Sequence, residues 1–130
     1  MIVPDASVML EVILRTATGM RALRPLLSED ESLHAPHLLD LEVVQVLRRY
    51  LRAGIIDEKR ATEALEDYSS FSIQRYPHDL FLARIWELRR NLTAYDAAYI
   101  ALAEALEATF LTCDRALAKS AGHRANIVLP

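Results

Sequence analysis

Short apolar runs alternate with longer segments of helical periodicity along the whole chain. Strands are predicted at residues 2–4, 31–36, 71–77, 108–113 and 126–130, because each is a brief apolar or alternating run. Helices are predicted at 7–14, 18–27, 37–54, 55–71, 78–91, 96–107 and 114–122, with 92–95 as a connector. This alternation predicts an α/β domain with a mostly parallel central sheet flanked by helices on both faces.

Two aspartates directly follow predicted strands. Asp5 comes after residues 2–4, and Asp114 comes after residues 108–113. The carboxyl ends of parallel strands lie along one edge of a sheet, where sites form, so we expect both carboxylates at that edge. Asp5, Asp96 and Asp114 also precede predicted helices, and aspartate is a favoured helix cap. Capping therefore stays open as the alternative for each of them taken alone.

Glu42 lies inside the predicted helix 37–54, where capping does not explain a carboxylate. At 100° per residue it falls at the edge of the apolar stripe of that helix, which comprises Leu39, Val43, Val46, Leu47 and Tyr50. The alternative is a boundary ion pair with Arg49. Asp40 lies in the first turn, where the helix dipole favours a negative charge, and we interpret it as structural.

Composition narrows the class of protein. A chain of 130 residues with 52% hydrophobic and 25% charged residues suits one globular domain. A net charge of −3 argues against an indiscriminate nucleic-acid binder, but it does not exclude a nuclease whose carboxylates are neutralised by bound cations. The single Cys113 excludes an internal disulfide, and the four histidines lack zinc-site spacing. No apolar run is long enough to span a bilayer, and we expect a cytoplasmic protein.

Four motifs, in order, resemble the PIN-domain nucleases and in particular the VapC-type toxins of bacterial toxin–antitoxin pairs. They are IVPDAS, PHLLDLE ahead of VVQVLRR, YDAAYIALA and LTCD, and the likeness extends over essentially the whole chain. The resemblance implies a single PIN-like domain over residues 1–130. It further implies an acidic cluster that holds Mg²⁺ or Mn²⁺ and cuts RNA, formed by Asp5, Glu42, Asp96 and Asp114.

The same resemblance implies hydroxyl groups beside the carboxylates, supplied by Ser7 and Thr112. Pro4 departs from the family, which more often has an aliphatic residue there. Proline cannot donate a ladder hydrogen bond, so we expect Pro4 at the very end of its strand.

Carboxylates in this number suit a hard divalent cation. Such cations prefer oxygen ligands, and Mg²⁺ takes only one or two protein carboxylates directly. Clustered carboxylates raise each other's pKa, and a bound cation relieves that repulsion. We expect direct metal contacts from Asp5 and Asp96, with Asp114 and Glu42 completing the shell or orienting water. Two ions roughly 4 Å apart would serve in-line attack at phosphorus, and one ion is equally consistent.

The resemblance also implies partners: an RNA substrate, a cognate VapB-type antitoxin and a second copy of the chain in a homodimer. Arg49 is the candidate RNA contact because it lies on the Glu42 side of its helix. The candidate apolar contacts for protein partners are Tyr68, Phe81, Trp86 and Leu88, with burial in the core as the alternative.

Other functions stay open. A PIN nuclease of RNA processing and a non-catalytic PIN-like binding module share the same fold. A phospho-acceptor receiver domain is disfavoured, because Asp5 stands alone after the first strand and no lysine follows ATFLTC.

Overall fold

The computed structural model describes all 130 residues and is built on a five-stranded sheet. The strands are β1 (Ile2–Pro4), β2 (Leu33–Pro36), β3 (Ile73–Tyr76), β4 (Thr109–Leu111) and β5 (Asn126–Val128). Their order is β3-β2-β1-β4-β5, and every neighbouring pair is parallel. The predicted parallel α/β architecture is confirmed. The direction of the strand order reverses at β1, so the crevice for a site lies at the carboxyl ends of β1 and β4.

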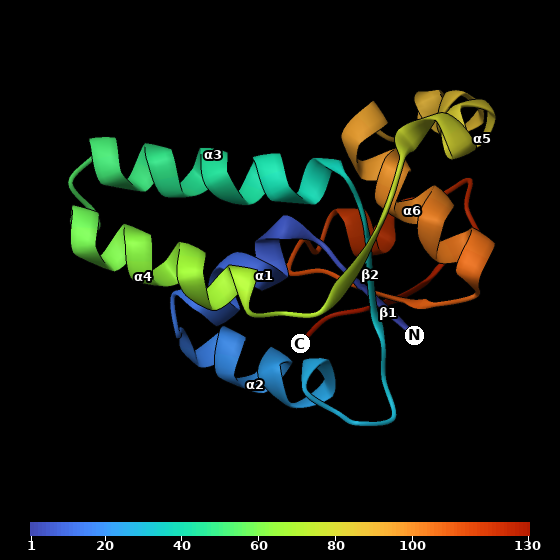
Figure 1. The fold of residues 1–130 in the computed structure, drawn as a ribbon. Helices are drawn as coiled ribbons and strands as arrows, with labels where there is room; N and C mark the ends of the chain where they lie inside the picture. The colour runs from blue at the N-terminus through green and yellow to red at the C-terminus, as the bar shows by residue number, and fades with distance from the viewer.

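Helices cover both faces of this sheet. They are α1 (Ala6–Ile13), α2 (Ala17–Leu26), α3 (Leu38–Arg52), α4 (Glu58–Ser69), α5 (Leu82–Glu87) and α6 (Ala94–Leu106), with short 3₁₀ helices η1 (His78–Phe81), η2 (Leu88–Arg90) and η3 (Leu117–Lys119). Figure 1 shows α1 to α4 together on one side of the strands and α5 and α6 on the other. Residues 97–103 of α6 are all buried, so this helix is a core element. No helix is long and apolar enough to cross a membrane.

One predicted connector is shorter than expected, and one predicted helix is wrong. Residues 92–95 are not simply a connector, because α6 begins at Ala94, where the Thr93 hydroxyl caps the helix by accepting the Asp96 N–H. Residues 114–122 do not form the predicted helix and contain only η3. Ser120 turns to an extended conformation, and its hydroxyl donates to the carbonyl of Leu117, which ends the 3₁₀ turn after Lys119.

The segment 78–91 is helical, as predicted, but in three short pieces rather than one continuous helix. Two apolar residues of this segment differ in how far they are buried. Leu88 is buried in the core, whereas Trp86 is 67% exposed. Tyr68 of α4 is also buried, and Phe81 is partly so. Burial therefore removes Leu88 and Tyr68 as surface contacts for a partner protein and leaves Trp86 available.

Pro4 is the last residue of β1 and stands opposite Leu111 of β4. The Ile2 N–H donates toward the β2 side, to Ser32, whereas the Asp5 N–H donates to the carbonyl of Leu111 on β4. By the alternation of a strand, the missing N–H of Pro4 falls on the β2 side, and the β1–β2 register is confined to Ile2 opposite Leu33. The bond to Leu111 holds Asp5 against β4, so Pro4 does not displace the carboxylate from the sheet edge.

Candidate active site

Asp5 is a buried carboxylate, and both of its oxygens accept hydrogen bonds from neighbouring groups of the protein. It is the N-cap of α1, where its Oδ1 accepts the Val8 N–H at 3.0 Å and the Ser7 hydroxyl at 2.5 Å. Its Oδ2 accepts the hydroxyl of Thr112 at 2.5 Å. Burial raises the pKa of Asp5 above its ordinary value, although these hydrogen bonds oppose the rise. Capping and membership of a site are therefore compatible at this residue.

Thr112 joins two of the carboxylates. It is fully buried just after β4, and while its hydroxyl donates to Asp5 it also accepts the backbone N–H of Asp114 at 3.0 Å. Asp114 in turn uses Oδ1 to accept the N–H groups of Ala116 and Leu117. The aspartate is thus fixed as the start of a turn, and its second oxygen, Oδ2, accepts no hydrogen bond from the protein.

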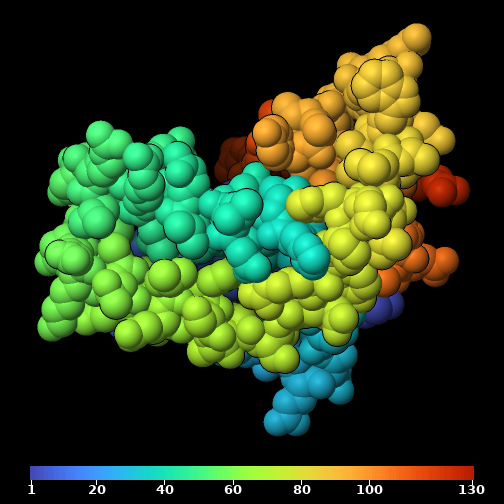
Figure 2. Space-filling model, turned by 45° about the horizontal axis from the view of Figure 1, so that its top comes forward, coloured from blue at the N-terminus to red at the C-terminus, as the bar shows by residue number.

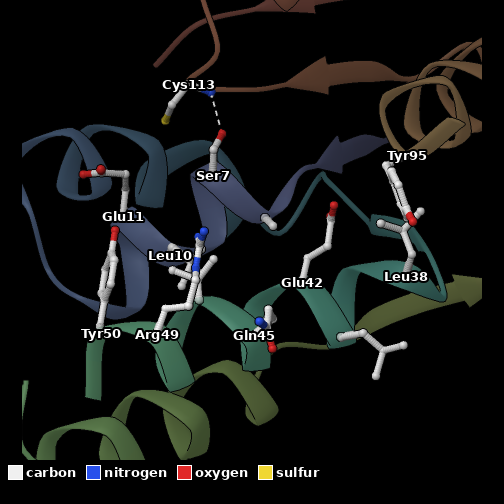
Figure 3. Close-up of a pocket in the computed structure, with 13 residues that line it drawn as sticks. Ser7, Leu10, Glu11, Leu38, Glu42, Gln45, Arg49, Tyr50, Tyr95 and Cys113 are labelled. Carbon is white, nitrogen blue, oxygen red and sulfur yellow. Dashed lines mark hydrogen bonds between the residues drawn. The ribbon is translucent and has the colours of Figure 1, made fainter. Parts of the chain in front are cut away.

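Glu42 points from α3 into the space beside α1 and the start of α6 (Figure 3). Its Oε2 accepts the hydroxyl of Tyr99 at 2.6 Å, and Oε1 accepts no hydrogen bond from the protein. Burial raises the pKa of Glu42, and the negative charges of Asp5 and Asp96 raise it further. The alternative of an ion pair with Arg49 is wrong, because neither residue takes part in a salt bridge.

Asp96 lies in the first turn of α6 rather than at its cap, since Thr93 has that role. Burial raises the pKa of Asp96, and the charge of Asp114 adds to the rise. The electrostatic couplings therefore link all four predicted carboxylates in a chain, from Asp5 to Glu42, to Asp96 and on to Asp114.

The donor chemistry of this cluster fits a hard divalent cation. All four groups are carboxylates. Burial disfavours the charged forms of Asp5, Glu42 and Asp96, repulsion from neighbouring carboxylates adds to this at Glu42 and Asp96, and a bound cation would reverse both effects. No three His, Cys, Asp or Glu side chains are arranged to hold one metal ion in common. Mg²⁺ does not require three, because it usually binds one or two carboxylates and keeps several waters.

A cavity of about 580 Å³ opens beside the cluster, between α1 and α3. Glu42 lies with Tyr95 and Leu38 at one end in the view of Figure 3, whereas Ser7 and Cys113 lie farther along, across from Arg49 of α3. The Ser7 hydroxyl, besides donating to Asp5, accepts the Cys113 N–H at 2.9 Å. Ser7 and Thr112 therefore both contact the Asp5 carboxylate.

Sequence reasoning did not find Tyr99, although it holds Glu42 by a hydrogen bond. Its burial and the Glu42 carboxylate raise the pKa of Tyr99 far above the ordinary value, which keeps the phenol protonated as a donor. The spacing in the sequence could have indicated Tyr99, because it lies three residues after Asp96 and therefore on the same face of the helix.

Asp40, interpreted as structural, has its own partners away from the cluster. It accepts from the guanidinium of Arg75 on β3 and from the hydroxyl of Tyr68 on α4. Those bonds hold the pKa of Asp40 below its ordinary value even though burial acts in the opposite direction. It provides a carboxylate control on the same helix as Glu42.

Comparison with known proteins identifies the family. The family model described as PIN domain matches residues 2–122. The chain is 37% identical to the ribonuclease VapC12 of Mycobacterium tuberculosis, over 99% of this chain and 98% of that one, and 41% identical to the ribonuclease VapC1 of the same organism, over 92% and 90%. The chain belongs to the PIN-domain family and, within it, to the VapC ribonucleases.

Solved structures agree with that fold. The crystal structure of PAE2754 from Pyrobaculum aerophilum superposes with a TM-score of 0.70 at 28% identity, covering 97% of this chain and 81% of that one. VapC20 of Mycobacterium tuberculosis, described as a toxin that cleaves the sarcin-ricin loop, gives a TM-score of 0.65 at 19% identity, covering 91% and 93%.

Proposed function

We propose that this chain is the toxin of a VapBC-type pair and a divalent-metal-dependent endoribonuclease that hydrolyses RNA at Asp5, Glu42, Asp96 and Asp114. The observation that carries the proposal is a pair of hydrogen-bonded links between the carboxylates, in a member of the VapC ribonucleases: Thr112 joins Asp5 to Asp114, and Tyr99, on the same helix as Asp96, binds Glu42. The substrate is cellular RNA, and the proposed compartment is therefore the cytoplasm.

Each residue of the proposed site has a separate role. Asp5 and Asp96 are the proposed direct metal ligands, while Glu42 and Asp114, each with one carboxylate oxygen free of protein donors, complete the shell or orient the attacking water. Bound Mg²⁺ or Mn²⁺ would supply charge neutralisation at the phosphate and a more acidic water. Thr112 and Ser7 fix the Asp5 carboxylate, and Tyr99 fixes Glu42.

The direct test is RNA cleavage by the purified chain. We expect cleavage with Mg²⁺ or Mn²⁺, none with excess chelator, and recovery when metal is restored. Asp5→Asn and Asp96→Asn are expected to lose activity, whereas Asp40→Asn keeps it. A chain that binds RNA but never cuts it under these conditions would instead favour the non-catalytic binding module.

The toxin role has a separate test in cells. We expect expression of the chain alone to arrest growth, co-expression of its VapB-type antitoxin to restore growth, and the Asp5→Asn chain to be harmless. Normal growth despite confirmed expression of active chain would favour a PIN nuclease of RNA processing. The proposed homodimer is tested by the mass of the purified chain in sedimentation equilibrium.

A further inference from the structure

Two large aromatic side chains are left exposed on α5 and α6, which are separated by the short helix η2. Trp86 of α5 and Tyr95 of α6 are each 67% exposed. The α5 segment is anchored by Leu88, which is 1% exposed, and by the partly buried Ile85, so its outer side carries Trp86 and Leu82. Figure 2 shows this yellow segment projecting from the body beside the first orange residues of α6. The rings are held by a packed scaffold, yet they contact solvent.

Free positive charge accompanies the tryptophan. The Arg89 guanidinium carbon lies 4.4 Å from the centre of the Trp86 ring, and an Arg89 nitrogen donates to the Trp86 carbonyl at 2.8 Å. Arg89 and Arg90 are exposed and take part in no salt bridge, unlike the neighbouring Arg84, which binds Glu87 and Glu104. This segment therefore carries an exposed aromatic ring and two arginines without ion pairs, in a chain whose net charge is −3.

The element that carries Arg89 packs against the helix that carries Asp96. η2, which carries Arg89 and Arg90, packs against α6, and the first turn of α6 contains Tyr95 and Asp96. Tyr95 lines the same cavity as Glu42, and Figure 3 shows both side chains at the same end of it. Tyr95 is the chain neighbour of Asp96, and α5, which carries Trp86, is joined to α6 through the single short element η2.

We propose that Trp86, backed by Arg89, and Tyr95 form a stacking track for unpaired nucleotides of the RNA next to the phosphate that is cut. The inference rests on the proposed ribonuclease function. Bases stack on exposed aromatic rings while arginines contact the backbone, and only single-stranded segments present free base faces.

A second copy of the chain is the other occupant that an exposed tryptophan suits. RNA is favoured because a two-fold interface built on this patch would bring equivalent surfaces together, including the unpaired Arg89 and Arg90 of both copies. Like charges would then face each other, whereas a polyanion neutralises them.

The chain carries its own reporter, since Trp86 is its single tryptophan. A single-stranded RNA 12-mer of mixed sequence, labelled with fluorescein, is titrated with the full chain in chelator, so that no cleavage occurs. We expect the unlabelled 12-mer to quench the tryptophan emission, and we expect the dissociation constant from this quenching to equal the one from the anisotropy of the labelled 12-mer. Inorganic polyphosphate, which has charge but no bases, is expected to bind without that quenching.

Variants distinguish base stacking from nonspecific apolar binding. Trp86→Ala is expected to weaken binding of the 12-mer by roughly 5- to 100-fold, and Trp86→Phe to retain most of it. Leu82→Ala is the matched control, an exposed apolar residue of the same helix at 59% exposure, and is expected to bind as wild type. Arg89→Ala is expected to reduce the slope of log affinity against log salt by about 0.7.

Three results would overturn the inference: binding of the 12-mer without quenching, equal affinity of Trp86→Ala and Leu82→Ala, or conversion of a dimer to a monomer by both substitutions. The last would identify a subunit interface. The ribonuclease proposal is judged separately, by chelator-sensitive cleavage of RNA by the wild-type chain. It stands if that cleavage occurs, whichever way the quenching experiment falls.

Discussion

Replacing Thr112 with valine removes the one hydroxyl that joins Asp5 to Asp114. That hydroxyl is fully buried, donates to Asp5 Oδ2 at 2.5 Å and accepts the Asp114 N–H at 3.0 Å. Valine has nearly the same shape, so packing is conserved while both hydrogen bonds are lost. The substitution therefore isolates the contribution of the hydroxyl to the position of the two carboxylates.

The structure sets the size of the effect. A hydrogen bond to a charged group contributes about 1.5–3 kcal/mol, and an unpaired buried N–H costs about 1–3 kcal/mol. Asp5 keeps its bonds from Ser7 and Val8, so we expect Thr112→Val to lower the free energy of unfolding by about 2–4 kcal/mol. Thr112→Ser keeps the hydroxyl and loses one buried methyl group, at a cost of about 1 kcal/mol.

The assay is urea unfolding of the three chains in chelator, followed by RNA cleavage at saturating Mg²⁺. We expect Thr112→Ser to remain close to wild type in cleavage rate and Thr112→Val to be much slower at a temperature where it is still folded. If the valine and serine variants unfold within about 0.5 kcal/mol of each other and cut RNA equally fast, the hydroxyl does not hold the site.

Three further predictions concern the carboxylates. Burial raises the pKa of Asp5 above 3.8, so between pH 3.8 and the raised pKa the folded chain keeps a proton that the unfolded chain has lost. The free energy of unfolding of the metal-free chain therefore falls as the pH rises through this range. Urea unfolding should show a smaller fall for Asp5→Asn than for wild type. Mg²⁺ at 100 times its Kd should raise the free energy of unfolding by about 2.7 kcal/mol; in thermal unfolding, Asp96→Asn should lose most of this gain and Asp40→Asn none. Tyr99→Phe should cost about 1 kcal/mol in stability and slow cleavage while RNA affinity, measured by anisotropy, stays unchanged; equal cleavage rates would mean that Glu42 needs no orientation by Tyr99.

Much of the fold was accessible from pattern alone, because each strand is a short apolar run and most of the helices show clear periodicity. The parallel sheet and the membership of the VapC ribonucleases predicted from the four motifs are confirmed. Boundaries were less accessible where two capping residues compete. Thr93 and Asp96 are both good caps, and the sequence does not say that the Thr93 hydroxyl takes the position, which moves Asp96 into the first turn.

Motif positions predicted the four carboxylates as one site, and both that membership and their roles as metal ligands and in catalysis stay a prediction. What pattern could not supply are the groups that come from distant parts of the chain, such as Tyr99 at Glu42, 57 residues away, and Thr112 at Asp5, 107 residues away. Such pairings depend on how the sheet brings β1 and β4 together. The absence of an ion pair at Arg89, beside Trp86, is equally a tertiary property, since the sequence does not reveal that Arg84 is paired and Arg89 is not.

The central claim is that the four carboxylates bind a divalent cation that enables RNA cleavage. The most direct measurement is a calorimetric Mn²⁺ titration of the wild-type, Asp96→Asn and Asp40→Asn chains, run beside RNA cleavage at the same metal concentrations. We predict that wild type and Asp40→Asn bind Mn²⁺ alike and cut RNA in proportion to occupancy, while Asp96→Asn binds far more weakly and does not cut. Undiminished Mn²⁺ binding and cleavage by Asp96→Asn would contradict the account.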